Sequence, residues 1–164
     1  MKKPQIKFSK IILILSVFLL LSSCKTNSNT GETPTGDWVK FEILLEGSHG
    51  NISPRQHTLI SSQKMLDELF EQINSTQHPG AEVPEIDFSK YQVGLVSMGE
   101  LSSGGYAISI ESIEKTNEHI RINLITESPA PGENVTSVMT SPFVLFKFEK
   151  QALPVEFNYL TDKW

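Results

Sequence analysis

One stretch of the chain, residues 62–74, has the 3.6-residue period of an amphipathic helix. Its apolar positions are Met65, Leu66, Leu69, Phe70 and Ile73. Acidic and amide side chains occupy the other face, and Ser61 or Ser62 stands where a hydroxyl group caps the first helical turn. Since this is the one convincing helical pattern in the folded part, we expect a single helix packed by its apolar face against β-structure.

Apolar residues elsewhere mostly alternate with polar ones, which is the two-residue period of a β-strand. The predicted strands are residues 38–46, 56–60, 91–98, 106–114, 120–125, 143–149 and, more weakly, 155–159. Residues 91–98 are almost continuously apolar, which predicts a central strand. Ile113 breaks the alternation of its strand, which predicts a bulge near Ser112. We therefore expect one α+β domain over residues 38–164, a mainly antiparallel β-sheet with one packed amphipathic helix.

The first 24 residues have the pattern of a bacterial lipoprotein export signal. Four lysines precede an apolar run from Ile11 to Leu21, which is shorter than the roughly 20 residues of a membrane-spanning helix. Leu21-Ser22-Ser23-Cys24 then resembles a lipobox, whose cysteine receives a diacylglycerol and becomes the first residue after cleavage. We expect a signal peptide over residues 1–23 and a lipidated Cys24. A plain secretory signal and an uncleaved anchor are the alternatives.

The segment after the signal, residues 24–37, has no large apolar side chain and predicts a flexible tether that follows the lipidated cysteine. Cys24 is the single cysteine, so the chain cannot form an internal disulfide or a thiolate metal cluster. Lys25 rather than Asp follows it. We therefore expect an extracytoplasmic protein, lipid-anchored to the bacterial cell envelope, with the outer membrane or periplasmic face favoured over inner-membrane retention.

The charge of the chain excludes one class of partner. Loss of residues 1–23 removes four of the 14 basic residues and none of the 19 acidic ones, so the formal net charge falls from −5 to −9. Binding to nucleic acid needs clustered basic residues, so no nucleic-acid partner is expected. An acidic domain is also not expected to lie flat on an anionic membrane.

No set of residues has the spacing of a catalytic or metal site. The four histidines, His49, His57, His78 and His119, contain no i, i+4 pair and no His-Glu-x-x-His motif. Ser102 and Ser103 lack the Gly-x-Ser-x-Gly elbow. Glu82, Glu85 and Asp87 offer oxygen ligands for Ca²⁺ but lack the spacing of an EF-hand. We expect no enzymatic activity, cofactor or metal. A lipoprotein that binds a small molecule or glycan, or an envelope hydrolase, is the alternative.

Four ordered stretches between Gln56 and Lys150 carry a family resemblance. They are Ile60-Ser61-Ser62-Gln63-Lys64-Met65 through Leu69-Phe70; Ile86-Asp87-Phe88-Ser89-Lys90-Tyr91 followed by Gly99; Ser103-Gly104-Gly105-Tyr106-Ala107-Ile108; and Pro131-Gly132, Val135-Thr136 and Thr140-Ser141-Pro142-Phe143. In this order they resemble the PrcB C-terminal domain family, named for a lipoprotein subunit of a bacterial surface protease complex. The resemblance implies a non-catalytic, protein-binding accessory lipoprotein that stabilises or tethers a surface or secreted partner, with a protease as one candidate.

Two loops form the candidate contact surface for such a partner. The Gly-rich loop at residues 99–105 contains glycines that adopt backbone conformations closed to other residues, and the loop at residues 128–141 is rich in proline. The predicted contact residues are Ser103, Gly104, Gly105, Tyr106, Pro131, Val138 and Met139. For Tyr106 a buried structural role is the alternative.

Overall fold

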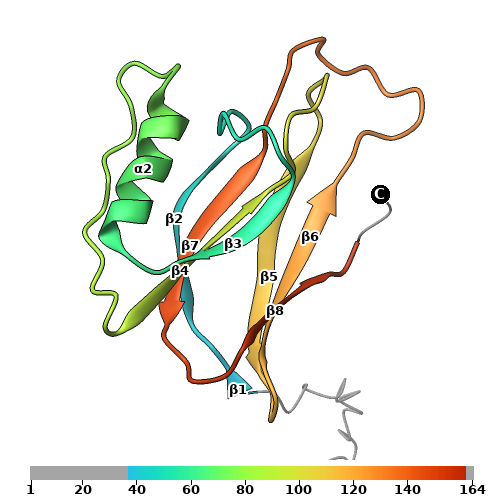
Figure 1. Ribbon diagram of the computed structural model, residues 1–164. Helices are drawn as coiled ribbons and strands as arrows, with labels where there is room; N and C mark the ends of the chain where they lie inside the picture. Colours follow the sequence, from blue (N-terminus) through green and yellow to red (C-terminus); the bar gives the residue numbers. More distant parts are fainter. Residues whose placement is uncertain (1–36, 162–164) are drawn as a thin grey trace, which may run out of the picture. The chain divides into compact units, whose positions relative to one another are not determined.

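The structure is a computed structural model that describes residues 37–161. Within these residues, the segments of alternating polarity form eight strands and the amphipathic segment forms one helix. The elements are β1 (Asp37–Trp38), β2 (Phe41–Gly47), β3 (Gln56–Ile60), α2 (Gln63–Asn74), β4 (Tyr91–Ser97), β5 (Ala107–Lys115), β6 (Ile120–Glu127), β7 (Phe143–Glu149) and β8 (Val155–Tyr159). The strands form two four-stranded sheets (Figure 1). We call β2-β7-β4-β3 the inner sheet and β1-β5-β6-β8 the outer sheet.

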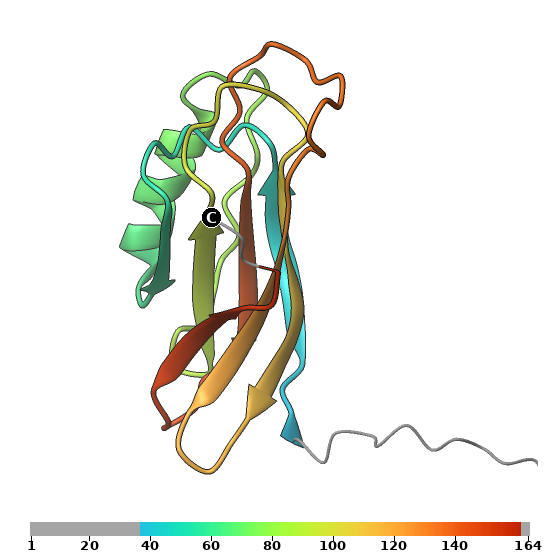
Figure 2. The ribbon, with the colours of Figure 1, turned by 90° about the vertical axis from the view of Figure 1, so that its right-hand side faces the viewer.

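The inner sheet is covered on both faces. Helix α2 packs on one face and the outer sheet faces the other, as Figures 1 and 2 show. Alternation along β4 separates two cores: Val93 and Leu95 pack with the helix, whereas Val96 packs with the outer sheet. This double burial explains why residues 91–98 are almost continuously apolar, and it confirms the predicted central strand, since β4 lies between β7 and β3.

The predicted helix and bulge are both confirmed. Ser62 caps α2, because its Oγ accepts a hydrogen bond of 3.3 Å from the backbone N–H of Met65. The buried helical residues are Leu66, Leu69, Phe70 and Ile73. In β5 the register with β6 shifts between Ile110 and Ser112, at the predicted bulge. The α+β fold with mainly antiparallel pairing is therefore as expected.

The first predicted strand, residues 38–46, is wrong as a continuous element. Its beginning is β1, which pairs with the end of β5, and its remainder is β2, which pairs with β7. The chain crosses from one sheet to the other at Val39 and Lys40, and the N–H of Val39 still donates to the carbonyl of Ile113 at 2.9 Å. Alternation marks a strand but does not say which sheet it joins. The expected single sheet is thus two sheets, and β8 pairs with β6 in parallel.

The predicted signal peptide, the predicted lipidation site Cys24 and the predicted tether up to Gly36 lie outside the described residues. Strand β1 begins at Asp37, one residue before the predicted start of the domain. Among residues 37–161, no helix has the length and apolarity that would let it span a membrane.

Candidate functional site

The two loops predicted as a contact surface meet at one end of the domain. Leu101 and Thr140 exchange backbone hydrogen bonds of 2.8 and 2.9 Å, and the N–H of Gly104 donates to the carbonyl of Thr136 at 3.0 Å. The hydroxyl of Thr140 also donates to the carbonyl of Ser103 at 2.8 Å. These bonds make one surface from residues 99–106 and 128–142, which we call the apex surface; it lies at the top of Figure 1.

Two glycines allow this close contact between the loops. A Cβ at Gly104 would lie 2.4 Å from the Oγ1 of Thr136. Gly105 has a φ of +89°, and a Cβ there would lie 2.7 Å from the Cγ of Pro129. At Gly105 the positive φ and the contact with Pro129 both disfavour any larger residue, and at Gly104 the Thr136 hydroxyl would have to move aside. Gly104 and Gly105 therefore shape the surface, and their role in the structure is to seat the second loop.

The second loop presents apolar side chains to solvent. The side chain of Val138 is 51% exposed and that of Met139 is 63% exposed. Pro131 is exposed as well. Tyr106 is partly buried and packs against the core between the two sheets, which supports the structural alternative for this residue. Among the predicted contact residues, Val138 and Met139 are the most suitable for contact with a partner.

A third segment, residues 48–53, ties the apex surface to the inner sheet. The N–H of Ser141 donates to the carbonyl of Ser48 at 2.8 Å, and the N–H of Gly50 donates to the carbonyl of Ser141 at 3.0 Å. The hydroxyl of Ser53 donates to Glu100 Oε1 at 3.0 Å. The ends of both loops are thus held by backbone bonds, so their exposed side chains project from a fixed base.

The apex surface has an acidic border. Within residues 37–161, no ion pair involves the carboxylates around it, which are Glu46, Glu100, Glu127 and Glu133. Glu133 instead accepts a hydrogen bond of 2.8 Å from the N–H of Ala130 and closes a turn within the second loop. Unpaired carboxylates around an apolar centre favour a partner that carries positive charge.

The sequence analysis did not predict that Leu101, Thr136 and Thr140 hold the two loops together. Leu101 and Thr140 are 39 positions apart, and neither has a local pattern that would reveal the pairing. The nearest signal was the Gly104-Gly105 pair, because adjacent glycines often mark a close approach of two backbones.

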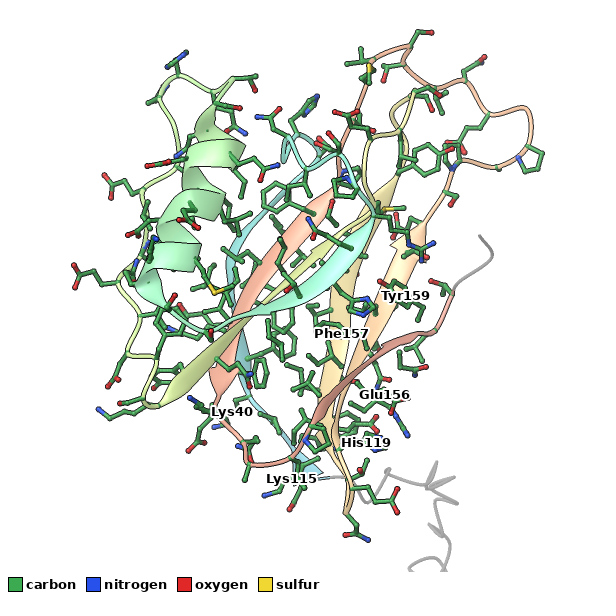
Figure 3. The ribbon with its side chains drawn as sticks, viewed as in Figure 1. Lys40, Lys115, His119, Glu156, Phe157 and Tyr159 are labelled. Atoms are coloured by element: carbon green, nitrogen blue, oxygen red, sulfur yellow. The ribbon has the colours of Figure 1, made fainter. Side chains whose placement is uncertain are left out.

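His49 lies beside the apex surface, where it forms a β-bridge with Ser141, whereas His57 and His119 lie elsewhere in the domain. His119 and Glu156 lie beside each other on the outer sheet, with Nε2 and Oε2 2.8 Å apart (Figure 3). His57 stacks on Phe157 with ring centroids 4.4 Å apart. Asp87 closes a local turn, where a hydrogen bond from the Ser89 hydroxyl and the neighbouring Lys90 lower the pKa of its carboxyl. Among the described residues, no group of three or more His, Cys, Asp or Glu side chains could hold a metal ion.

The fold is a small α+β domain with two facing sheets, a covering helix and a candidate contact surface built from two loops at one end. Residues 93–149 match the PrcB C-terminal family model, so the predicted resemblance is confirmed over this segment. The matched segment runs from β4 to the end of β7 and includes both apex loops. Comparison with curated proteins and with solved structures gave no match.

Proposed function

We propose that this chain is a non-catalytic accessory lipoprotein of the bacterial cell envelope, anchored through Cys24, which binds a protein partner at the apex surface. The partner is a surface or secreted protein that the domain stabilises or tethers, and a secreted protease is the first class to test. The match of residues 93–149 to the PrcB C-terminal family model supports an accessory role connected with a protease complex.

The observation that carries the proposal is the exposure of Val138 and Met139 on a loop whose ends are fixed. Exposed apolar side chains are common singly, but methionine is enriched at protein interfaces and adapts its shape to a partner. Backbone bonds at Thr136 and Thr140 hold the two ends of the segment that carries both side chains. Because the ends of this segment are already fixed, it loses little conformational entropy when a partner binds, and this favours a high affinity.

The acidic border adds a second property of the partner. Charged residues at the edge of a protein interface act mainly on the rate of association and on the salt dependence of that rate. A partner with a basic surface around an apolar pocket fits the charge of Glu100, Glu127 and Glu133. Binding should therefore become slower as ionic strength rises.

The test uses the full-length, tagged lipoprotein purified from detergent-solubilised membranes after cross-linking in cells. Replacement of Val138 and Met139 by Asp places two charges in the proposed interface. Because interface side chains that matter most contribute about 2 kcal/mol or more, recovery of a stoichiometric partner should fall at least tenfold.

Val83→Asp is the matched control, since Val83 is 40% exposed and lies away from the apex loops. Its partner recovery should equal that of the unchanged protein. Equal recovery from all three proteins would refute the apex surface as the binding site, and the absence of any stoichiometric partner would refute the accessory function itself.

A further inference from the structure

Two neighbouring hollows lie at the end of the domain where the described chain begins. The first, of about 570 Å³, lies between the β1–β2 crossover, the start of β4 and the end of β7. The second, of about 640 Å³, adjoins it and shares Tyr91, Glu149 and Gln151. We call this region the tether end, because the described chain begins here at Asp37, next to the predicted tether. It lies at the bottom of Figures 1 and 2, far from the apex loops.

Trp38 is an exposed aromatic side chain at the tether end. The side chain is 50% exposed and stands between the first hollow and a third one beside Ile113. The headgroup region of a bilayer is an environment that the amphipathic ring of tryptophan prefers.

Lysines gather around this tryptophan. Five of the eight lysines and arginines in residues 37–161 line the two hollows; they are Lys40, Lys90, Lys115, Lys147 and Lys150. Carboxylates in the same lining come from Asp37, Glu42 and Glu149. The lining therefore has more basic than acidic groups, although the domain as a whole is strongly acidic.

Three of these lysines have no ion pair within residues 37–161, and one of the three, Lys150, instead donates a hydrogen bond to the Phe88 carbonyl at 3.4 Å. Lys147 pairs with Glu42 at 2.9 Å and Lys90 pairs with Asp87 at 3.1 Å, whereas Lys40 and Lys115 form no such pair. Figure 3 shows both of them at the same end of the domain. Ammonium groups without an ion pair can bind the phosphate groups of an anionic bilayer, and an exposed indole ring beside them can enter its apolar interfacial layer.

The lipid anchor of the proposed function identifies that surface as a bilayer. Thirteen residues, 24–36, separate Cys24 from Asp37. Thirteen residues span at most about 45 Å even when fully extended, so a lipid on Cys24 would keep the tether end within that distance of the bilayer. The acidic apex would experience the opposite force from the same anionic surface.

We propose that the tether end docks on anionic phospholipid headgroups of the bilayer that holds the lipid anchor, with Trp38 in the interfacial layer and Lys40 and Lys115 against phosphate groups. The domain then stands end-on, with the apex surface directed away from the membrane toward its partner. This orientation rests on the lipid anchoring included in the proposed function. It agrees with the overall negative charge, which disfavours a flat orientation.

The experiment uses the full-length lipidated protein in vesicles of phosphatidylcholine, with or without phosphatidylglycerol, that contain lipids brominated on the acyl chain. The sequence has two tryptophans, so Trp164→Phe leaves Trp38 as the only reporter. In vesicles with phosphatidylglycerol the Trp38 emission should shift to the blue and be quenched by bromine. In phosphatidylcholine alone both effects should largely disappear.

Removal of charge provides the decisive comparison. Lys40→Ala together with Lys115→Ala should lower the ratio of docked to undocked protein by roughly tenfold or more in the phosphatidylglycerol vesicles. Lys64→Ala is the control, since Lys64 lies on α2, is highly exposed and lines neither hollow. Its quenching should match that of the unchanged protein. High salt should also reduce quenching, because exposed charges are screened.

Vesicle flotation separates the two levels of the proposal. Protein that floats while Trp38 remains unquenched, or is quenched regardless of Lys40 and Lys115, overturns docking and leaves the anchor in place. Protein that does not float, and whose N-terminal peptide lacks a lipid mass, overturns the anchor and the orientation together.

Discussion

Gly94 occupies a position where one added methyl group should strongly disturb the domain. It lies in β4 directly opposite Phe146 of β7, and a Cβ at this position would lie 2.3 Å from the Cζ of that ring. The Phe146 ring is fully buried between the sheets and stacks on Phe148 with centroids 5.9 Å apart. The ring can therefore move aside only by displacing its neighbours in a close-packed core.

The magnitude follows from two opposed effects of Gly94→Ala. Overpacking of a buried site costs about 1–3 kcal/mol, and the severe contact with Phe146 places this case at the upper end. Alanine also lowers the backbone entropy of the unfolded chain, which increases the free energy of unfolding by about 0.4–1 kcal/mol. We expect the free energy of unfolding to fall by about 2 kcal/mol, which lowers the urea midpoint by about 1 M for a small domain.

Urea unfolding followed by circular dichroism measures this loss, with Gly47→Ala as the matched control. Gly47 ends β2 in the same sheet, and a Cβ there would make ordinary contact with Phe143 at 3.6 Å. This control should be neutral or slightly stabilising. Phe146→Leu should relieve the crowding, so the double variant with Gly94→Ala should lose clearly less stability than the two single changes added together. Equal midpoints for the two alanine variants, or strict additivity in the double variant, would refute the argument.

Two further predictions concern local contacts. Asn51→Ala removes the side-chain hydrogen bond of 2.8 Å to the Ile73 carbonyl and leaves a residue with a Cβ at a φ of +53°. Urea unfolding should therefore show that the free energy of unfolding falls by about 2 kcal/mol. Asn51→Gly should lose less stability, because glycine tolerates this φ. For Asp87, hydrogen bonding from Ser89 and the nearby Lys90 lower the pKa below its ordinary value of 3.8. Its ionised form therefore favours the fold above the ordinary pKa, and this contribution is lost as pH falls through the lowered value. A carboxyl titration by NMR that shows no increase in the Asp87 pKa after Ser89→Ala would contradict this explanation.

Elements with local signals could be predicted from sequence. Helix α2 was predicted because its apolar residues repeat with the helical period, and the bulge near Ser112 was predicted because the strand alternation changes phase there. The division of residues 38–46 between two sheets has no such signal. Pairing of β1 with Lys115 and of β2 with Phe148 depends on residues distant in sequence.

The candidate site was predicted only in part, for a similar reason. Gly104 and Gly105 and the proline-rich loop are visible in the sequence, but their contact is not. The burial of Tyr106 and the exposure of Met139 follow from the way the loops pair through Thr140. The tether end was missed completely, since its lysines come from four separate parts of the chain.

For this protein, periodicity alone determined the helix and most of the strands, and short motifs were enough to predict the family resemblance and an expected lipid anchor at Cys24. These properties depend on neighbouring residues, or on short peptides that an enzyme or a family comparison recognises directly. The tertiary structure decided which strands share a sheet, which side chains the apex presents to solvent, and where Lys40 and Lys115 stand beside Trp38. The physical reason is that burial and charge clustering depend on contacts between distant segments, and such contacts exist only once the chain has folded.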